Sequence, residues 1–503
     1  MLKITVKCLL YNMSDGCEKT LDKMMLQFCS AKRYAYNRIV ENMNNKDFKL
    51  HHLDGVIQDK YNLNSRQAKD AIEIARQTKQ SQVELIDTYI SDLQDKIKPI
   101  LKKLEDKELP DKKRQALVSK LDKRTRKLNK YLEHKKNNTL PSIIFGGKEN
   151  FYKRCAGKIS NEEFKKNRNN QFVSRGDKTK DGNPNLRVIE DEKGMFFLEI
   201  TTLEKIYKDG KDTGRYVKIK TPLYIPEKRS KKTGSVNGFH YKVALIRFLN
   251  LGEAYQVELL KRNGKIYAHI TFDLEKPRLD ATGNNYMIGI DTNPDGLALT
   301  MIDRKGQYIW HTYLKDHRLL HVNGNIRDNI CGELACAAVR VAKIYGAGMS
   351  IEDLNFKDNV DVKGKFRRVK SQFCYSKLIK SLESACYKYG VEFTKVKPHF
   401  TSKIGLYKYC HQYGMYIHNG AAMVIARRAY GYIEKVPKTF KKLFEPINII
   451  EKDKLITEKI EIYDEFSTWK HISKRMHSVL RKNNHPRFFM ENRKDITKGF
   501  IFS

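Results

Sequence analysis

The chain has 503 residues, which is long enough for several domains and for at least one well-buried core. It carries 97 Lys and Arg residues against 59 Asp and Glu residues, a formal charge of +38, so we expect its main partner to be a polyanion such as a nucleic acid. No apolar stretch approaches the length of a membrane span, and the first residues lack the apolar core of a signal peptide. We therefore expect a cytoplasmic protein with no membrane partner.

The nine cysteines are scattered, and no two of them form a Cys-x-x-Cys pair. This spacing argues against a disulfide framework and against a zinc ribbon. Reduced cytosolic thiols are the expected state.

The N-terminal third of the chain is expected to be largely helical. Residues 2–12 alternate apolar and polar side chains like a strand, and residues 21–44 have helical periodicity. Charged helical sequence continues to about residue 137, and Pro110 divides its second half into a helical hairpin. One arm has an apolar face, formed by Leu117, Leu121 and Leu128, with cations opposite. The hairpin is either a solvated coiled structure or a surface that follows a phosphate backbone.

Residues 138–184 are polar and basic, and they are expected to be irregular. Gly146 and Gly147, with aromatic and cationic neighbours, would let the backbone approach a nucleic acid. Lys148 is a candidate phosphate contact, and Phe151 or Tyr152 is a candidate for stacking on a base. The alternative is an ordinary loop.

Residues 185–277 show short β-type segments separated by turns. The expected strands are 196–201, 216–221, 241–248, 254–260 and 266–272. Asp209-Gly210 and Asn263-Gly264 are hairpin turn signals, and the spacing is typical of a small barrel that the first strand would join. The basic loop 226–234 is either a phosphate contact or a solvated turn.

Residues 287–303 predict a hairpin that places Asp291 at the end of a buried strand. A carboxylate at such a position is costly unless a metal or a partner compensates its charge. The alternative is a turn-capping residue beside Asp295.

The elements that follow Asp291 have the order of an RNase H-type fold. A third strand is expected near residues 308–313, followed by alternating helices and strands at 327–346, 348–356, 375–389, 391–398 and 419–433. In that fold the first and fourth strands are adjacent, which would bring Asp291 and Glu352 together. Two carboxylates so placed can hold divalent ions for phosphodiester cleavage, and oxygen ligands suit Mg²⁺. The alternative for Glu352 is a strand-end acid paired with a lysine.

Three segments also carry a family resemblance. The sequences at 289–298, 351–356 and 401–403 with 418–428 resemble, in order and spacing, the motifs of the RuvC-like nuclease domain of TnpB-type transposon proteins and compact type V CRISPR effectors. The stretch Phe28–Tyr36 resembles the N-terminal helix of that family.

The resemblance implies a mixed α and β multidomain fold built around an RNase H-like RuvC nuclease domain. Its expected parts are the first strand of a wedge β-barrel (1–15), a helical recognition domain (16–184), the wedge barrel (185–285), the RuvC-like domain (286–440) with an inserted target-binding loop near 357–415, and a basic C-terminal extension (441–503). Residues 468–482 of that extension form an amphipathic helix that either docks on the nuclease domain or contacts RNA.

The function that the resemblance implies is RNA-guided DNA cleavage with Mg²⁺, or Mn²⁺ as the alternative, with a guide RNA and a target DNA as partners. Base pairing would supply most of the sequence specificity. The resemblance adds Arg33, Tyr36, Lys403 and Arg427 as candidate nucleic-acid contacts, although Arg427 and Arg428 could equally brace the site. The alternatives are a cleavage-deficient RNA-guided DNA-binding protein and, more distantly, a transposase acting on DNA ends. The sequence predicts no oligomeric state.

The third motif departs from the family, because His418 stands where a catalytic Asp is usual. Imidazole suits Mn²⁺ better than Mg²⁺, and His418 could complete the metal site, move a proton, or simply cap its helix. Asp295 is a possible substitute ligand. Asp353 is a poor one, because neighbouring residues on a strand point to opposite faces.

The segment before His418 lacks the two Cys-x-x-Cys pairs common in the family. Only Cys410 and His411 remain as possible ligands, so no zinc is expected. We expect packing of Tyr407, Tyr409 and Tyr413 to hold this segment instead.

Overall fold

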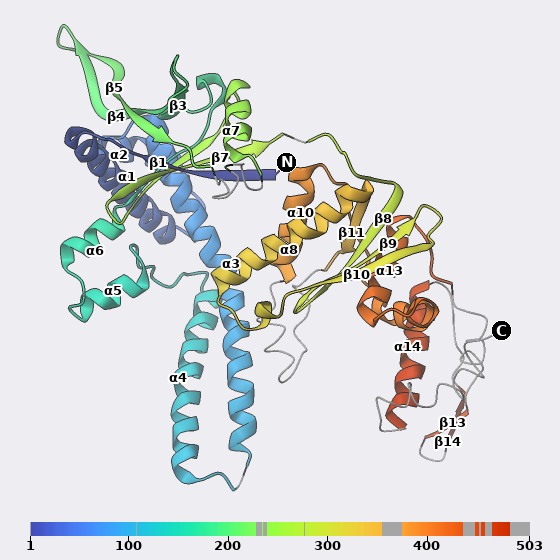
Figure 1. Cartoon of the computed structure of the whole chain (residues 1–503). Helices are drawn as coiled ribbons and strands as arrows, with labels where there is room; N and C mark the ends of the chain where they lie inside the picture. The colour runs from blue at the N-terminus through green and yellow to red at the C-terminus, as the bar shows by residue number, and fades with distance from the viewer. Residues whose placement is uncertain are drawn as a thin grey trace. The chain divides into compact units, whose positions relative to one another are not determined.

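A computed structural model describes residues 2–106, 108–227, 234, 239–275, 277–354, 375–435, 448–451, 454–457 and 465–482. The chain divides into two compact units, Met1–Glu275 and Lys276–Ser503 (Figure 1). Within the described residues, none of the helices combines the length and apolar character that a bilayer span requires. The target-binding loop predicted near 357–415 lies partly outside the described residues, as does most of the C-terminal extension.

The first unit contains one seven-stranded sheet in the order β2-β6-β7-β1-β5-β4-β3, with antiparallel pairing throughout. The strands are β1 (Leu2–Leu10), β2 (Gln171–Ser174), β3 (Leu186–Glu190), β4 (Phe196–Lys208), β5 (Lys211–Tyr224), β6 (Gln256–Arg262) and β7 (Lys265–Leu274). The first strand joins the later ones as predicted. The predicted barrel is wrong, because β2 and β3 end the sheet and do not pair with each other in the described part of the chain.

The two predicted hairpin turns are confirmed. Asp209 and Gly210 have φ of 52° and 75°, and Asn263 and Gly264 have φ of 50° and 73°. A two-residue turn with positive φ at both positions matches the twist of the flanking strands, and Asn, Asp and Gly tolerate that conformation best.

The predicted strand 241–248 is wrong, because these residues form helix α7 (Tyr241–Asn250). Its β-branched and aromatic residues favour a strand locally. The helix prevails because Leu245 and Phe248, three residues apart, are both buried, and the ring of Phe248 packs 4.8 Å from that of Phe272 on β7. Tertiary packing therefore decides this element.

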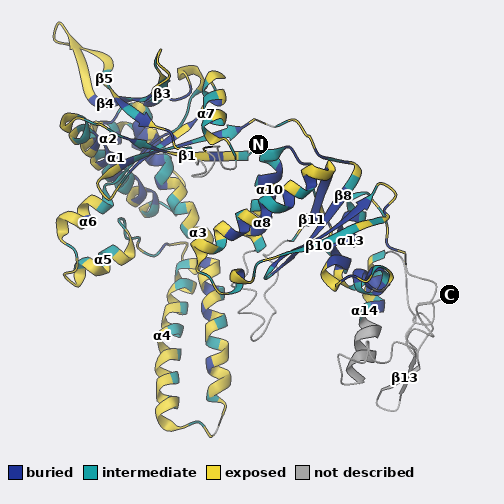
Figure 2. Ribbon diagram, viewed as in Figure 1, coloured by how far each residue is buried: buried dark blue, intermediate teal, exposed yellow. Residues whose placement is uncertain are grey.

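The remaining helices of the first unit are α1 (Asp15–Glu41), α2 (His52–Tyr61), α3 (Ser65–Leu104), α4 (Asp111–Lys136), α5 (Lys148–Cys155) and α6 (Asn161–Arg168), with the short turn η1 (Lys178–Lys180). The α3–α4 hairpin is confirmed, and α4 is mostly exposed (Figure 2). The expectation of irregular structure over 138–184 is wrong, since this segment forms α5, α6 and the edge strand β2.

The second unit contains a five-stranded sheet in the order β10-β9-β8-β11-β12 and a separate two-stranded sheet. The large sheet is formed by β8 (Thr282–Asn293), β9 (Gly296–Asp303), β10 (Tyr308–Lys315), β11 (Ala347–Glu352) and β12 (Phe393–Val396), and the small one by β13 (Asn448–Glu451) and β14 (Lys454–Thr457). Strands β8 and β11 are parallel neighbours. The predicted adjacency of the first and fourth strands is therefore confirmed.

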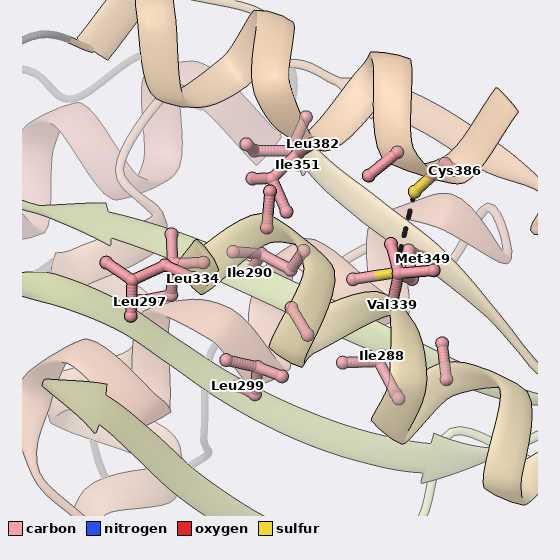
Figure 3. Close-up of a cluster of buried hydrophobic side chains, with 14 of the residues drawn as sticks. Ile288, Ile290, Leu297, Leu299, Leu334, Val339, Met349, Ile351, Leu382 and Cys386 are labelled. Atoms are coloured by element: carbon pink, nitrogen blue, oxygen red, sulfur yellow. Dashed lines mark hydrogen bonds between the residues drawn. The ribbon is translucent and has the colours of Figure 1, made fainter. Parts of the chain in front are cut away.

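The helices of this unit cover both faces of the large sheet. They are η2 (His317–Leu320), α8 (Gly324–Tyr345), α10 (Tyr375–Tyr389), α11 (Thr401–Ile404), the π-helical turn η4 (Gly405–Cys410), α12 (His411–Tyr413), α13 (Ile417–Ala429) and α14 (Glu465–Lys482). Helices α8 and α10 bury one face in an apolar core (Figure 3), where the Cys386 sulfur lies 3.6 Å from that of Met349. Helix α13 packs on the opposite face.

Helix α13 approaches the sheet at backbone distance. A Cβ added to Gly289 on β8 would lie 1.9 Å from the Ala422 carbonyl oxygen, so only glycine fits at this crossing. Asn419 anchors the helix by donating to the carbonyl of Thr312 at 2.9 Å, and the Thr300 hydroxyl donates to the Asn419 carbonyl at 2.8 Å. These contacts set the position of the first turn of α13, which carries His418.

Candidate active site

Strands β8 and β11 each carry an acidic residue where their pairing with each other stops: Asp291 lies two residues before the end of β8, and Glu352 is the last residue of β11. Ile290 pairs with Ile351 across the two parallel strands, and Asp291 and Glu352 are the next residues. Because side chains alternate along a strand, the two isoleucines share the α8 and α10 face and the two acids share the α13 face. The sequence prediction that these acids come together is consistent with this register.

Asp291 is buried, with 8% of its surface exposed, and His418 contacts it directly. The His418 Nδ1 lies 3.0 Å from Oδ2 of Asp291, and Nδ2 of Asn293 donates to the same oxygen at 3.1 Å. The imidazole donates to this carboxylate in the tautomer that carries its proton at Nδ1. This hydrogen bond raises the pKa of His418, burial opposes the shift, and the charges of Asp291 and Asp295 add to it.

Glu352 is partly buried and is held by Thr401 of α11, whose hydroxyl donates to Oε1. Burial raises the pKa of Glu352 to about 7; the Thr401 hydrogen bond opposes this shift and the charge of Asp291 adds to it. Tyr375, at the start of α10, also belongs to this neighbourhood. Burial raises its pKa to about 12, with contributions from the charges of Asp291 and Glu352.

Asp295, the suggested substitute ligand, is bound to β10. The Tyr313 hydroxyl donates to its Oδ1 at 2.5 Å, and the Lys315 ammonium lies 3.3 Å from Oδ2. Burial would raise the pKa of Asp295, but these two partners outweigh it and lower the pKa. Asp353 is exposed, and its backbone N–H donates to Val396. Asp295 therefore acts first as a strand-to-strand link.

The donor set fits a divalent cation at the two carboxylates. Among the residues that the structure describes, no three His, Cys, Asp or Glu side chains are arranged to hold one ion. Asp291 and Glu352 nevertheless present oxygen ligands from adjacent parallel strands, and the charge of Asp291 raises the pKa of Glu352. A cation between them would relieve this repulsion, and Mg²⁺ commonly uses one or two protein carboxylates with water completing its shell.

The segment before α13 is held by a buried ion cluster around Glu434. Its carboxylate accepts from Lys408 at 2.6 Å, from the Tyr409 hydroxyl at 2.6 Å and from Arg427 at 2.8 Å. Burial alone would raise the pKa of Glu434, but Lys408, Tyr409 and Arg427 lower it. Trp469 of α14 donates to the Glu434 carbonyl at 2.7 Å.

The predicted aromatic packing before α13 is present. Tyr407 and Tyr409 are buried, and the ring of Tyr413 stacks on Tyr308 at 4.7 Å. Of the two alternatives left open for the C-terminal amphipathic helix, the structure shows docking, because Trp469 and Ile472 of α14 lie in the apolar cluster beside α13. The Cys410 side chain is buried, and the side chain of His411 lies outside the described residues.

Among the predicted nucleic-acid contacts, Arg33, Tyr36 and Arg427 are engaged within the protein. Arg33 donates to the Arg168 carbonyl at 3.1 Å, and the buried Tyr36 donates its hydroxyl to Gln82. Arg427 also donates to the Gly306 carbonyl at 2.5 Å. These three side chains stabilise the packing of their own helices.

Lys148, Phe151 and Tyr152 lie on α5, and Lys403 is partly exposed on α11. Phe151 packs on Phe164 with ring centroids 6.1 Å apart, whereas Tyr152 is 57% exposed. Tyr152 is therefore the better placed of the two for stacking.

The sequence interpretation assigned no role to Thr401, Tyr313 or Glu434. Thr401 follows the αL residue Phe400, which has φ of 60°. A bulky residue rarely adopts that backbone conformation, and the local sequence does not predict it. Glu434 gathers partners from 7 to 35 positions away in the chain, so no local pattern could have identified it.

Comparison with solved structures finds low overall similarity. The RuvC structure of Thermus thermophilus is 13% identical, with 29% of this chain and 93% of that chain covered and a TM-score of 0.22. A CRISPR-Cas12f ternary complex is 14% identical, with coverage of 84% and 98% and a TM-score of 0.23. A Cas12i1 R-loop complex after target DNA cleavage is 9% identical, with coverage of 73% and 63% and a TM-score of 0.29.

A comparison with curated proteins finds no match. The family model described as the SSO2105 N-terminal domain matches residues 3–278, which is more than half of the chain. The match ends within a few residues of the boundary between the two compact units, at Glu275. The chain therefore belongs to the SSO2105 N-terminal domain family.

Proposed function

We propose that this protein is an RNA-guided DNA endonuclease that hydrolyses phosphodiester bonds at Asp291 and Glu352 with Mg²⁺ or Mn²⁺. The observation that carries the proposal is the register of β8 and β11, which places Asp291 and Glu352 directly after the last paired residues of two adjacent parallel strands and on one face. The motifs around these residues resemble those of RuvC-like nucleases, as described above. The charge of +38 supports polyanionic partners.

In this proposal Asp291 and Glu352 bind the ions. Divalent cations so held would polarise the phosphate and lower the pKa of an attacking water. Thr401 orients the Glu352 carboxylate through its hydroxyl, and Asn293 orients Asp291. The site is thus supported by side chains that do not themselves react.

His418 would serve as a proton carrier next to the carboxylates. Its Nδ1 is committed to Asp291, which leaves Nε2 as the nitrogen that can exchange a proton with the substrate. The side chain is 46% exposed, so solvent or substrate can reach it. A histidine with a raised pKa gives a proton to a leaving oxygen near neutral pH.

The guide RNA would be held mainly by the cationic surfaces of the first unit, including the exposed face of α4. Lys148 and Tyr152 on α5 offer a cation and an exposed ring for the same partner. The guide would select the DNA by base pairing.

The test begins with the nucleic acid that copurifies with the protein. A discrete, nuclease-protected RNA is expected, and its absence would favour a transposase-like protein. The ribonucleoprotein is then incubated with DNA complementary to the RNA in Mg²⁺ and separately in Mn²⁺. Wild type and Asp353→Ala should cleave, because Asp353 is exposed and lies just beyond the end of β11. Asp291→Ala should not cleave.

A second candidate is a guided DNA-binding protein that has lost cleavage. Two observations favour it: a histidine stands at the third motif, and no three described side chains are arranged around one ion. Target binding without cleavage in both metals would establish this candidate and reject the nuclease.

A further inference from the structure

The β12–α11 connection, residues 397–400, leads to the side chain that holds Glu352. Val396 ends β12 as the strand partner of Glu352, and Thr401 is the first residue of α11. Thr401 is 2% exposed, and its hydroxyl lies within hydrogen-bond distance of both Glu352 Oε1 and the Pro398 carbonyl. The position of this hydroxyl therefore depends on the path of the four residues before it.

Phe400, the last residue of the connection, has a strained backbone. Its φ of 60° and ψ of 12° lie in the left-handed region, which a bulky residue rarely adopts. Such a conformation persists only where the surrounding structure imposes it. Contacts to Phe400 and its neighbours therefore determine where α11 begins.

Helix α14 supplies part of these contacts. The ring of Phe466 lies 5.3 Å from that of Phe400 and meets the imidazole of His399 edge-on at 4.9 Å. Three residues further along α14, Trp469 is 1% exposed and belongs to the apolar cluster against which Phe400 packs. The first turn of α14 thus contacts two of the four residues of the connection.

Arg428, near the end of α13, holds the other end of the connection. Its guanidinium donates to the Lys397 carbonyl at 2.7 Å and pairs with Glu465 of α14 at 3.2 Å. Burial raises the pKa of Glu352, and both the Thr401 hydrogen bond and the charge of Arg428 oppose that shift. Arg428 is therefore near enough to Glu352 for its charge to act there, and it also joins the connection to α14.

We propose that α14 is part of the candidate active site. Phe466 and the Glu465–Arg428 pair fix the β12–α11 connection. The fixed connection keeps the Thr401 hydroxyl on the carboxylate of Glu352. Phe466, Glu465 and Arg428 are positioning residues, since none of them touches the reacting atoms. The inference rests on the proposed function for the role of Glu352 as an ion ligand, and it deepens that function by making the site depend on a helix of the C-terminal extension.

The first measurement is hydrogen exchange of the full chain, freed of copurified nucleic acid and without metal. The amide of Ile404 reports on the start of α11, because it donates to the Phe400 carbonyl at 2.8 Å. Phe466→Ala and Glu465→Gln should each speed its exchange about fivefold or more, since the turn opens more often when the connection is released. Mass spectrometry of a peptide that contains Ile404 measures this rate.

Each of these variants has a matched control in the same compact unit. Tyr345→Ala removes a ring of α8 that is 45% exposed, against 42% for Phe466. Glu383→Gln removes a carboxylate of α10 that pairs with Lys395 of β12 at 3.4 Å. Both controls should leave the exchange of Ile404 at the wild-type rate, because neither side chain contacts the connection.

The second measurement is a double-mutant cycle on Mn²⁺ affinity, read from the paramagnetic resonance signal of the free ion without DNA. Phe466→Ala and Thr401→Val should each weaken Mn²⁺ binding about tenfold, as changes behind the ligands of a metal site usually do. In the Thr401→Val background, Phe466→Ala should add less than about threefold, because it acts through the lost hydroxyl. Phe466→Tyr keeps the ring and should bind Mn²⁺ as wild type does.

Unchanged exchange of Ile404 in both Phe466→Ala and Glu465→Gln would overturn the proposal. Effects of Phe466→Ala and Thr401→Val on Mn²⁺ affinity that multiply in the double variant would overturn it as well, since the two residues would then act independently. If Asp291→Ala bound Mn²⁺ as tightly as wild type, the proposed metal site would fail, and the exchange result alone would decide whether α14 holds the connection. An intact metal site with unchanged exchange would reject only the role of α14, so the two proposals fail separately.

Discussion

The two faces of the five-stranded sheet are both covered by helices, but they differ in what they contain. The α8 and α10 face packs Ile290, Leu299 and Ile351 into a continuous apolar core. The α13 face carries Asp291 and Glu352 from the same strands. One face therefore supplies burial of apolar surface, and the other concentrates polar groups that oppose folding.

The polar face carries visible costs. The Ser350 hydroxyl on β11 is buried, with no hydrogen-bond partner among the described residues, and such a group costs about 1–3 kcal/mol. The raised pKa of Glu352 is a second cost at neutral and higher pH, because the ionised form is less stable in the folded protein than in the unfolded chain. Burial of apolar side chains on the α8 and α10 face therefore offsets the cost of the polar residues on the α13 face.

Two consecutive residues of β11 should separate the faces most sharply. Glu352→Ala is expected to lower the cleavage rate at least about a thousandfold without lowering stability, because it removes a proposed metal ligand and an unfavourable buried charge. Ile351→Ala should cost about 2–5 kcal/mol of stability while folded molecules still cleave. Cleavage rate per folded molecule and denaturant unfolding measure both effects. If Glu352→Ala and Ile351→Ala lowered stability equally, the two faces of the sheet would not differ in this way.

Glu434 should link stability to pH on the α13 side. Glu434→Gln is expected to cost about 3 kcal/mol at pH 7, because it leaves Lys408 and Arg427 without their buried counter-charge. The folded-state pKa of Glu434 is lowered, so its contribution is present above the ordinary Glu pKa of about 4.3 and is lost as the pH falls through the folded-state value.

Thermal unfolding of wild type and Glu434→Gln from pH 7 to pH 3 measures this linkage. The difference between the two proteins should shrink only at the acidic end. A difference that stays constant across the range would contradict a charge-based contribution.

Two glycines differ in how closely other atoms approach them: Gly289 lies where α13 crosses β8, and Gly332 lies on α8 with open space around it. Gly289→Ala should destabilise the protein by about 1–3 kcal/mol and slow cleavage, because its Cβ would displace the backbone of α13 and with it His418. Gly332→Ala on α8 meets nothing within 4 Å and should instead stabilise the helix by about 0.5–1 kcal/mol. Denaturant unfolding and cleavage rates distinguish the two, and a tolerated Gly289→Ala would show that α13 can move away.

His418 should have the smallest effect on the proposed reaction. His418→Asn is expected to slow cleavage about 10–100-fold, since the amide can still donate to Asp291 but cannot carry a proton. Rates measured in Mg²⁺ and in Mn²⁺ test whether His418 also ligates the ion. A larger loss in Mn²⁺ would indicate ligation, and an unchanged rate in both metals would leave His418 without a chemical role.

Hydrophobic periodicity in the sequence was sufficient to predict most helices and strands, because the apolar residues recur regularly over long segments. The α3–α4 hairpin, the β8–β9 hairpin and the order of strands and helices after residue 286 follow directly from it. The strand predicted at 241–248 was wrong because its local β propensity is overruled by the packing of Leu245 and Phe248. The barrel was wrong for a related reason: strand spacing indicates a sheet but does not determine whether its ends pair.

The sequence by itself indicated that Asp291 and Glu352 follow the apolar runs of two buried strands, because hydrophobic pattern and the order of elements can be read along the chain. Only the tertiary structure decided what each carboxylate contacts. His418 meets Asp291 from 127 positions away, Thr401 meets Glu352 from 49 positions away, and Glu434 collects its cations from η4 and α13. Such contacts depend on where a helix crosses a sheet, and that is set by backbone approach at residues such as Gly289.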